Sequence, residues 1–250
     1  MDLGLKGKTA LIMASSQGLG RAVAEGLAAE GCNLIICARS EQKLENTAGE
    51  IAQSHKVQVV AVPADISTAE GRRRVLKQAK ENFDGVDILV TNSGGPSPGG
   101  FDDFQKEDWA SAYQLVFESV LEMVRGVLPH MRQQRWGRIV AINSVCVKEP
   151  IPNLTLSNGL RPAVSGMLRS LADEVAAEGI TVNNVMSGFH NTERVAALGL
   201  GDSVADSIPM KRIGQPGELA AAVVFLTSQQ ASYITGTSLP VDGGSTKSLL

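Results

Sequence analysis

The chain has 250 residues, of which 43% are hydrophobic and 20% are charged, with a formal net charge of −3 at pH 7. A chain of this length buries enough surface to fold without a disulfide or a structural metal. Its mild negative charge excludes the basic footprint of a nucleic-acid-binding or anionic-membrane-binding protein, and no apolar run approaches the roughly 20 residues of a membrane span.

The cysteines indicate a reducing environment. There are three of them, Cys32, Cys37 and Cys146, with no spacing that suggests a disulfide framework or a metal site. Cys32 and Cys37 fall in a predicted strand, where a free cysteine behaves as a small hydrophobic residue. No charged and then apolar leader precedes the first apolar run, so we expect a cytoplasmic protein.

Short β-branched runs alternate with longer helical stretches along the chain. The predicted strands are 9–14, 33–38, 57–62, 86–90, 138–142, 181–185 and 238–241, and the first two predicted helices are 19–30 and 41–53. Near-continuous apolar strands separated by helices indicate a parallel sheet covered on both faces. Because crossovers in such sheets are right-handed, the simplest topology is an α/β fold with a Rossmann-type doubly wound sheet.

No linker interrupts this alternation, so we expect residues 1–250 to form a single dinucleotide-binding domain. The stretch 93–100 is rich in Gly and Pro, but it directly follows a predicted buried strand. Ligands bind at the carboxyl ends of strands in such sheets, which makes this stretch a loop beside the cofactor. Residues 187–215 have weak strand periodicity, and we expect them to form a small helical lid over the substrate.

The turn after the first predicted strand has the composition of a phosphate-binding site. It reads Ala14-Ser15-Ser16-Gln17-Gly18-Leu19-Gly20 and leads directly into a predicted helix. Backbone N–H groups at a helix start lack partners, and the helix dipole favours an anion there. Glycines without a Cβ let the backbone approach the pyrophosphate closely. A tight turn without a ligand is the alternative.

The choice of cofactor is indicated at the end of the second predicted strand. Folds that bind NAD usually carry an acidic residue there for the ribose hydroxyls, whereas an arginine accommodates the 2′-phosphate of NADP. This chain has Ala38-Arg39-Ser40 and no acid. We therefore expect NADP(H), with Arg39 as the phosphate partner; the alternative is that Arg39 only covers the edge of the sheet.

With these residues in place, the chain resembles the short-chain dehydrogenase/reductase family, and within it the members similar to 3-oxoacyl-acyl-carrier-protein reductases. The resemblance covers essentially the whole chain. It rests on the segments 8–12, 64–66, 87–94, 128–131, 137–140 and, above all, the tail 208–244. The resemblance implies hydride transfer between NADP(H) and a small-molecule or acyl-chain carbonyl or alcohol, and a homotetramer or homodimer.

The resemblance also implies which residues bind the cofactor. They are Ala14, Ser16, Gln17, Gly18, Leu19, Gly20, Arg39, Asp65, Ile66, Asn92, Gly94, Arg161 and Thr192. Asp65 falls where the family places the Asp that contacts adenine, and Asn92 and Gly94 fall in the family's Asn-Asn-Ala-Gly segment. Ala14 stands where the family has its first glycine, a change of one methyl group. No metal ligands are expected.

The expected catalytic residues depart from the family pattern. Ser144 aligns with the family's catalytic Ser, but Ser157 stands in place of its Tyr and Arg161 in place of its Lys, while Val116 replaces the Asn of the preceding helix. A phenol beside a cation can donate a proton, whereas an aliphatic hydroxyl is far less acidic. Arg161 is permanently protonated, so it supplies a positive field but shuttles no proton.

Other residues are candidates for the missing acid. Ser157 and Arg161 share one helix face by their spacing, although Pro162 is unfavourable inside a helix beyond its first turn. Lys148 follows Ser144 by four residues, and a partly buried lysine can have a lowered pKa suited to acid–base chemistry. His190 is a second candidate; the two tyrosines, Tyr113 and Tyr233, fit a core or an interface better.

Three functions remain open at this point. The first is an NADP(H)-dependent oxidoreductase with a non-standard proton donor. The second is a non-catalytic or regulatory dinucleotide-binding protein on the same scaffold. The third is a related enzyme, such as a dehydratase or an epimerase, that uses the same pocket. The first is preferred, largely on family membership.

Overall fold

The computed structural model describes residues 1–197 and 203–248. The strands are β1 Thr9–Met13, β2 Asn33–Ala38, β3 Val59–Pro63, β4 Ile88–Thr91, β5 Gly137–Ser144, β6 Ile180–Ser187 and β7 Ser238–Val241. The longer helices are α1 Gly18–Ala29, α2 Glu41–His55, α3 Ala69–Asn82, α4 Lys106–Tyr113, α5 Ser119–Gln134, α6 Thr155–Val175 and α9 Pro216–Thr227. The short ones are η1 Phe101–Asp103, η2 Gln114–Glu118, η3 Val145–Val147, η4 Ala176–Glu178, α7 Glu193–Ala197 and α8 Ser203–Ser207.

The strands form one seven-stranded sheet in the order β3-β2-β1-β4-β5-β6-β7. Every pair of neighbouring strands is parallel. The order reverses its direction between β1 and β4, which is the switch point where doubly wound sheets open a crevice for a ligand. The predicted Rossmann-type doubly wound sheet is therefore confirmed.

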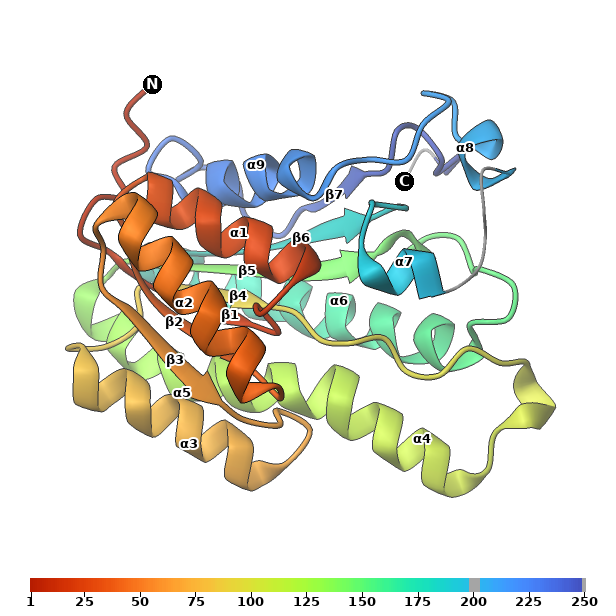
Figure 1. Ribbon diagram of the computed structural model, residues 1–250, viewed down its shortest axis with the longest axis horizontal. Helices are drawn as coiled ribbons and strands as arrows, with labels where there is room; N and C mark the ends of the chain where they lie inside the picture. Colours follow the sequence, from red (N-terminus) through yellow and green to blue (C-terminus); the bar gives the residue numbers. More distant parts are fainter. Residues whose placement is uncertain (198–202, 249–250) are drawn as a thin grey trace.

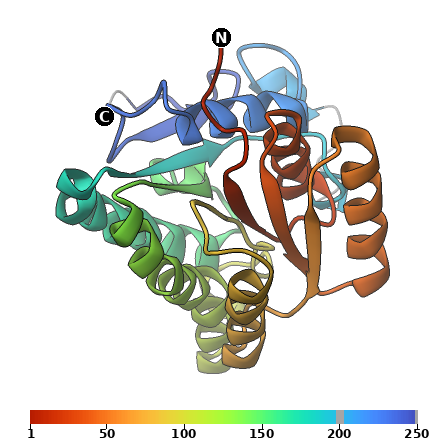
Figure 2. The same ribbon diagram turned by 90° about the vertical axis from the view of Figure 1, so that its left-hand side faces the viewer.

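Helices cover both faces of the sheet (Figures 1 and 2). One face packs against α1, α2 and α9, through apolar side chains such as Val23, Leu44 and Val223. The other face packs against α3, α5 and α6, through side chains such as Val75 and Leu168. Because helices cover both faces, strands β1, β4 and β5 are buried along nearly their whole length, as is usual for parallel strands.

The structure corrects two local expectations. Cys32 precedes β2 rather than lying in it, although it is fully buried, as are Cys37 and Cys146. Pro162 lies inside α6, in its third turn, and the helix continues through it to Val175. Among the residues that the structure describes, no helix is both long enough and apolar enough to cross a membrane.

Candidate functional site

The turn between β1 and α1 has an unusual backbone. Ala14 adopts a φ of +49° and Gly18 a φ of +58°, both in the left-handed region. Glycine enters this region at no cost, whereas alanine is strained there. A Cβ on Gly20 would lie 2.3 Å from the carbonyl oxygen of Ala14, so only glycine allows α1 to start this close to β1.

Two side chains fix this turn from behind. The buried Ser15 hydroxyl donates to the Ile12 carbonyl at 2.9 Å and accepts from the Cys37 amide at 3.2 Å, which ties the turn to β2. The Thr47 hydroxyl of α2 donates to the Ser16 carbonyl at 3.1 Å. The Ser15 hydroxyl is thus already used within the fold, whereas Ser16, Gln17, Gly18 and Leu19 keep some exposure.

The start of α1 is suited to an anion. Its N-cap, Gln17, makes no side-chain hydrogen bond to the first turn, and that turn contains no acidic residue. The N–H groups of the first turn therefore keep their positive character, which favours a phosphate. Gly18 faces Thr192, whose Cγ2 lies 3.5 Å from the position a Cβ would take.

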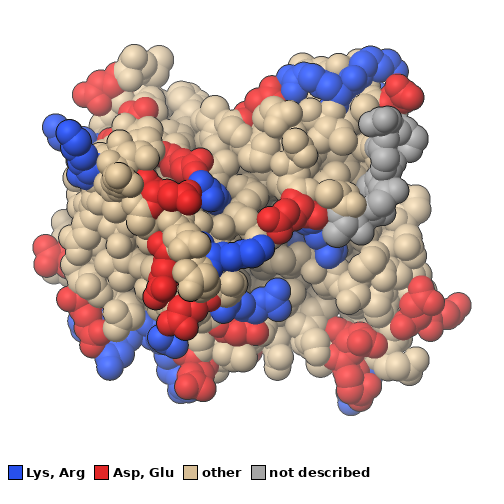
Figure 3. All heavy atoms as spheres, viewed as in Figure 1, with Lys and Arg blue, Asp and Glu red and all other residues tan. Residues whose placement is uncertain are grey.

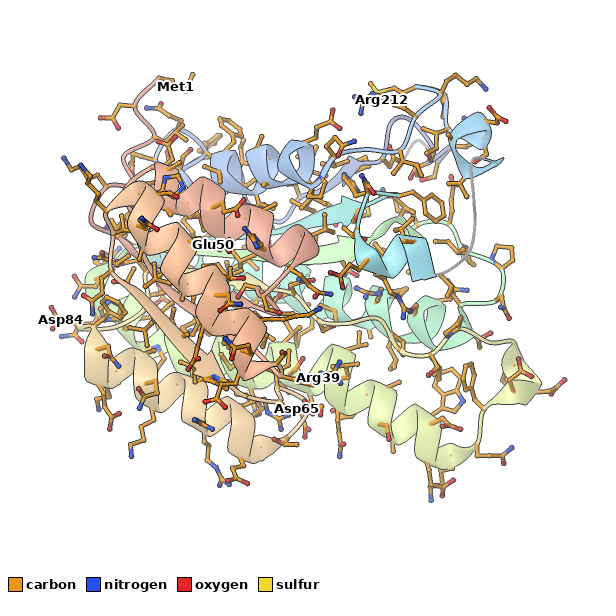
Figure 4. The ribbon with its side chains drawn as sticks, in the orientation of Figure 1. Met1, Arg39, Glu50, Asp65, Asp84 and Arg212 are labelled. Atoms are coloured by element: carbon orange, nitrogen blue, oxygen red, sulfur yellow. The ribbon has the colours of Figure 1, made fainter. Side chains whose placement is uncertain are left out.

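Arg39 and Asp65 follow the carboxyl ends of β2 and β3 and lie near each other below the start of α2 (Figure 4). Burial alone would raise the pKa of Asp65. Two hydrogen bonds from Ser67, at 2.7 and 2.9 Å, and the charge of Arg39 outweigh burial, so the pKa is lowered. Asp65 is therefore ionised at neutral pH, and the exposed Arg39 is free to meet an incoming phosphate.

The ends of β4 and β5 bring further predicted residues to the same edge of the sheet. Asn92, directly after β4, donates from Nδ2 to the Ala14 carbonyl at 3.4 Å and so links β4 to the phosphate turn. A Cβ on Gly94 would meet nothing within 4 Å, so the chain borders open space there. Ser144 ends β5, and its Oγ accepts from the Cys146 amide at 3.2 Å.

Helix α6 places Ser157 and Arg161 at this edge. Arg161 Nη1 donates to Asn143 Oδ1 at 3.4 Å, and Asn143 Nδ2 donates to the Arg161 carbonyl at 3.2 Å. Ser157 is 7% exposed, and its carbonyl accepts from Cys146 Sγ at 3.8 Å. Burial lowers the pKa of Arg161, and the charge of Arg194 acts in the same direction.

The predicted lid region 187–215 contains α7 and α8; residues 198–202 of it lie outside the described part of the chain. Glu193 pairs with Lys43 at 3.7 Å, and Lys43 donates to Gln17 at 3.1 Å. Arg194 Nη2 donates to the Pro96 carbonyl at 2.9 Å. Helix α7 thus spans from the phosphate turn to the loop after β4, and Figure 3 shows basic side chains gathered at the hollow in this face.

The candidate proton donors lie in different places. Lys148 caps η3 just beyond Ser144 and is half-buried. His190 is buried and lines a separate cavity of about 330 Å³ with Arg212, Glu218 and Asp242. Tyr113 is partly exposed and stacks on Phe117, and Tyr233 is fully exposed.

The structure brings three further residues to the site, which the sequence did not predict. Asn143 holds Arg161, while Lys43 and Arg194 hold α7. Asn143 directly precedes Ser144, and a polar residue in an otherwise apolar strand is a usable signal. Lys43 and Arg194 give no such signal, because their partners are about 100 or more residues away in the chain (Glu193 from Lys43, Pro96 from Arg194).

The structure places a phosphate turn at the switch point of a doubly wound sheet, a serine at the end of β5, and an arginine of α6 against the neighbouring Asn143. This arrangement is typical of oxidoreductases that bind a nicotinamide dinucleotide. The family model described as enoyl-(acyl carrier protein) reductase matches residues 13–246. The 3-oxoacyl-acyl-carrier-protein reductase FabG of Haemophilus influenzae is 35% identical over 242 residues, covering 96% of this chain and 98% of the relative. The chain belongs to the short-chain dehydrogenase/reductase family.

Two further similarities involve proteins whose names include NADPH. The NADPH-dependent reductase BacG of Bacillus subtilis is 29% identical over 256 residues, covering 97% of this chain and 99% of the relative. The crystal structure of L-sorbose reductase from Gluconobacter frateurii, complexed with NADPH and L-sorbose, superimposes with a TM-score of 0.95 and 33% identity over the whole of both chains.

Proposed function

We propose that the protein is an NADP(H)-dependent oxidoreductase that transfers a hydride between the nicotinamide and a carbonyl or alcohol substrate. The observation that carries this proposal is the pairing of a built phosphate turn with Arg39, and no acid, at the end of β2. The complex of a relative with NADPH supports the same cofactor. The substrate class is a small-molecule or acyl-chain carbonyl, with a 3-oxoacyl compound as the first candidate.

The residues of this edge fit such a cofactor. Ala14, Ser16, Gln17, Gly18, Leu19 and Gly20 would surround the pyrophosphate, with Arg39 at the 2′-phosphate and Asp65 and Ile66 at the adenine. Asn92, Gly94, Arg161 and Thr192 would lie along the nicotinamide half. When bound, NADPH supplies the hydride; the chain supplies the binding energy and the orientation.

Side chains of the protein would supply the other parts of the reaction: orientation of the substrate, stabilisation of charge and proton transfer. Ser144 would donate a hydrogen bond to the substrate oxygen, and Arg161 would stabilise the negative charge that develops there. Neither the Ser157 hydroxyl nor the guanidinium is an effective acid near neutral pH. Lys148, which follows η3 four residues after Ser144, is the proposed proton donor. We also propose that the protein is a homotetramer or a homodimer and that it lies in the cytoplasm.

Cofactor choice is tested by fluorescence titration with NADPH and NADH. NADPH should bind about 10–100-fold more tightly, because a charged hydrogen bond to the 2′-phosphate contributes about 1.5–3 kcal/mol. Arg39→Asp should abolish that preference. Arg73→Asp, which makes the same charge change on the exposed face of α3, should leave it intact. An unchanged preference in Arg39→Asp would refute the assignment.

Activity is tested by NADPH consumption with a panel of aldehydes, ketones and 3-oxoacyl thioesters. Ser144→Ala should lower kcat about 10²-fold, the effect of removing one donor to a developing oxyanion, without changing the Kd for NADPH. Lys148→Met should lower kcat without changing the Kd for NADPH, because it removes the proposed proton donor. Tight NADPH binding with no turnover across the panel would favour the non-catalytic function instead.

A further inference from the structure

A small recess lies at the carboxyl ends of β4 and β5, where they meet α6 and the segment η2–α5. Its volume is about 10 Å³. Thr91, Asn143 and Arg161 contribute polar groups to its lining, and Val116, Val120 and Val164 contribute apolar ones. A space of about this size, with several polar groups around it, holds a single water molecule.

The hydroxyl of Thr91 needs a partner. Thr91 is 1% exposed, and its Oγ1 makes no hydrogen bond within the described part of the chain. Buried polar side-chain atoms are hydrogen-bonded in the large majority of cases, to protein or to ordered water. Thr91 lines the recess, so the space beside it is the place for such a partner.

The guanidinium of Arg161 needs partners as well. It has five N–H donors, and among the described residues its only side-chain hydrogen bond is the long one, of 3.4 Å, to Asn143 Oδ1. It is paired with no carboxylate of the described residues. Arg161 is half-buried, and a charge partly withdrawn from bulk water in this way needs polar groups around it.

Asn143 cannot supply the missing hydrogen bonds of Thr91 and Arg161. Its Nδ2 already donates to the Arg161 carbonyl at 3.2 Å and to Ser165 Oγ at 3.0 Å. Its Oδ1 already accepts from the Ser144 amide at 3.0 Å as well as from Arg161. With this amide occupied, Thr91 Oγ1 and the Arg161 guanidinium are the groups left to be satisfied in the recess.

We propose that the recess holds one ordered water molecule, which accepts a hydrogen bond from Arg161 and exchanges one with Thr91 Oγ1. The water holds the Arg161 guanidinium in position beside the recess and solvates its charge. Thr91 is thereby a positioning residue for Arg161. The water site stands on the geometry alone, and only its effect on turnover rests on the proposed function.

The first test compares Thr91→Val with Thr181→Val, since both remove a buried hydroxyl that has no protein partner but Thr181 does not line the recess. Thr181→Val should raise the Tm by about 2–4 °C, because it removes an unsatisfied polar group. Thr91→Val should instead lower the Tm by a similar amount, because it strips a partner from a bound water. Equal rises in both variants would overturn the proposal.

The second test is crystallographic. A high-resolution structure of the wild type should show one water within hydrogen-bond distance of Thr91 Oγ1 and Arg161, and Thr91→Val should lose it and release the guanidinium from its position. An empty recess in the wild type would refute the water. An unmoved Arg161 in Thr91→Val would refute the positioning role.

The third test is kinetic. Thr91→Val should lower kcat about tenfold, and Thr91→Ser, which keeps the hydroxyl, should restore kcat to within about twofold of the wild type. An unchanged kcat in Thr91→Val would also refute the positioning role. If the wild type reduces no carbonyl compound, the proposed function fails, while the Tm comparison and the two crystal structures still decide whether the water and the positioning role are correct.

Discussion

Ala14 is a residue whose side chain does not suit its backbone conformation. The family has a glycine at this position, and the chain retains the left-handed backbone, φ +49°, although the residue is an alanine. A non-glycine residue in this region is strained by roughly 1–2 kcal/mol. The turn tolerates the strain because hydrogen bonds from the side chains of Ser15, Thr47 and Asn92 hold its backbone in place.

Ala14→Gly should therefore stabilise the protein. The relief of strain is partly offset by the greater freedom of glycine in the unfolded chain, which leaves a net gain of about 0.5–1 kcal/mol in the free energy of unfolding. Urea denaturation measures it. Gly18→Ala, which introduces the same methyl group at φ +58°, should shift the free energy in the opposite direction. A loss of stability in Ala14→Gly would contradict this account of the strain.

Single residues also show how far the sequence could predict the site. Spacing alone predicted that Ser157 and Arg161 share a helix face, and α6 brings both to the edge beside Ser144. Spacing did not predict the contact of Arg161 with Asn143, because that contact depends on how α6 packs on β5. Thr91 reaches the same place only through the pairing of β4 with β5, in which Thr91 lies opposite Ala141.

At the scale of elements, apolar periodicity predicted every strand, and the errors are confined to the strand ends. The fifth and sixth strands, predicted at 138–142 and 181–185, extend to Gly137–Ser144 and Ile180–Ser187. The extensions contain polar residues such as Asn143, Ser144 and Ser187, which pair within the sheet through the backbone. Composition underestimates the length of such strands, because that length is determined by pairing with the neighbouring strands.

Two helical elements lie beyond sequence prediction. Between α4 and α5 the backbone passes through a π-helical turn, η2 Gln114–Glu118, which places Val116 toward the recess. Turns of this type often occur at functional sites. Pro162 inside α6 removes one backbone donor, yet the helix is held by packing against β6 and by Asn143. In both cases tertiary packing overrides the local preference of the sequence.

At the scale of the whole molecule, the segment that connects β6 to α9 contains a buried histidine, His190. His190, which lies just after β6, pairs with Gly214 ahead of α9. Its Nδ1 lies 3.2 Å from Ser187 Oγ and 3.2 Å from the Gly188 carbonyl. Burial lowers the pKa of His190, and the charges of Glu218 and Asp242 offset this only in part. Arg212 pairs with Glu218 on the same side of the cavity.

This histidine makes stability depend on pH. In the unfolded chain a histidine binds its proton near pH 6.5, whereas folded His190 binds it only at a lower pH. Between these two values the unfolded state holds more protons, so stability should fall as the pH drops below about 6.5, by up to about 1.4 kcal/mol per pH unit. At pH 7.5 both states are mostly neutral, and this contribution nearly disappears.

The measurement is urea denaturation of the wild type and His190→Gln at pH 7.5 and pH 5.5. His190→Gln should destabilise the protein at pH 7.5, because the pairing around Gly214 is tightly packed, with His190 Cδ2 only 2.9 Å from the site of a Gly214 Cβ. Its deficit relative to the wild type should shrink at pH 5.5, where the wild type begins to bear the cost of a buried charge. His55→Gln at the end of α2 controls for the loss of a histidine as such. A deficit that stays constant between the two pH values would show that protonation of His190 is not linked to unfolding.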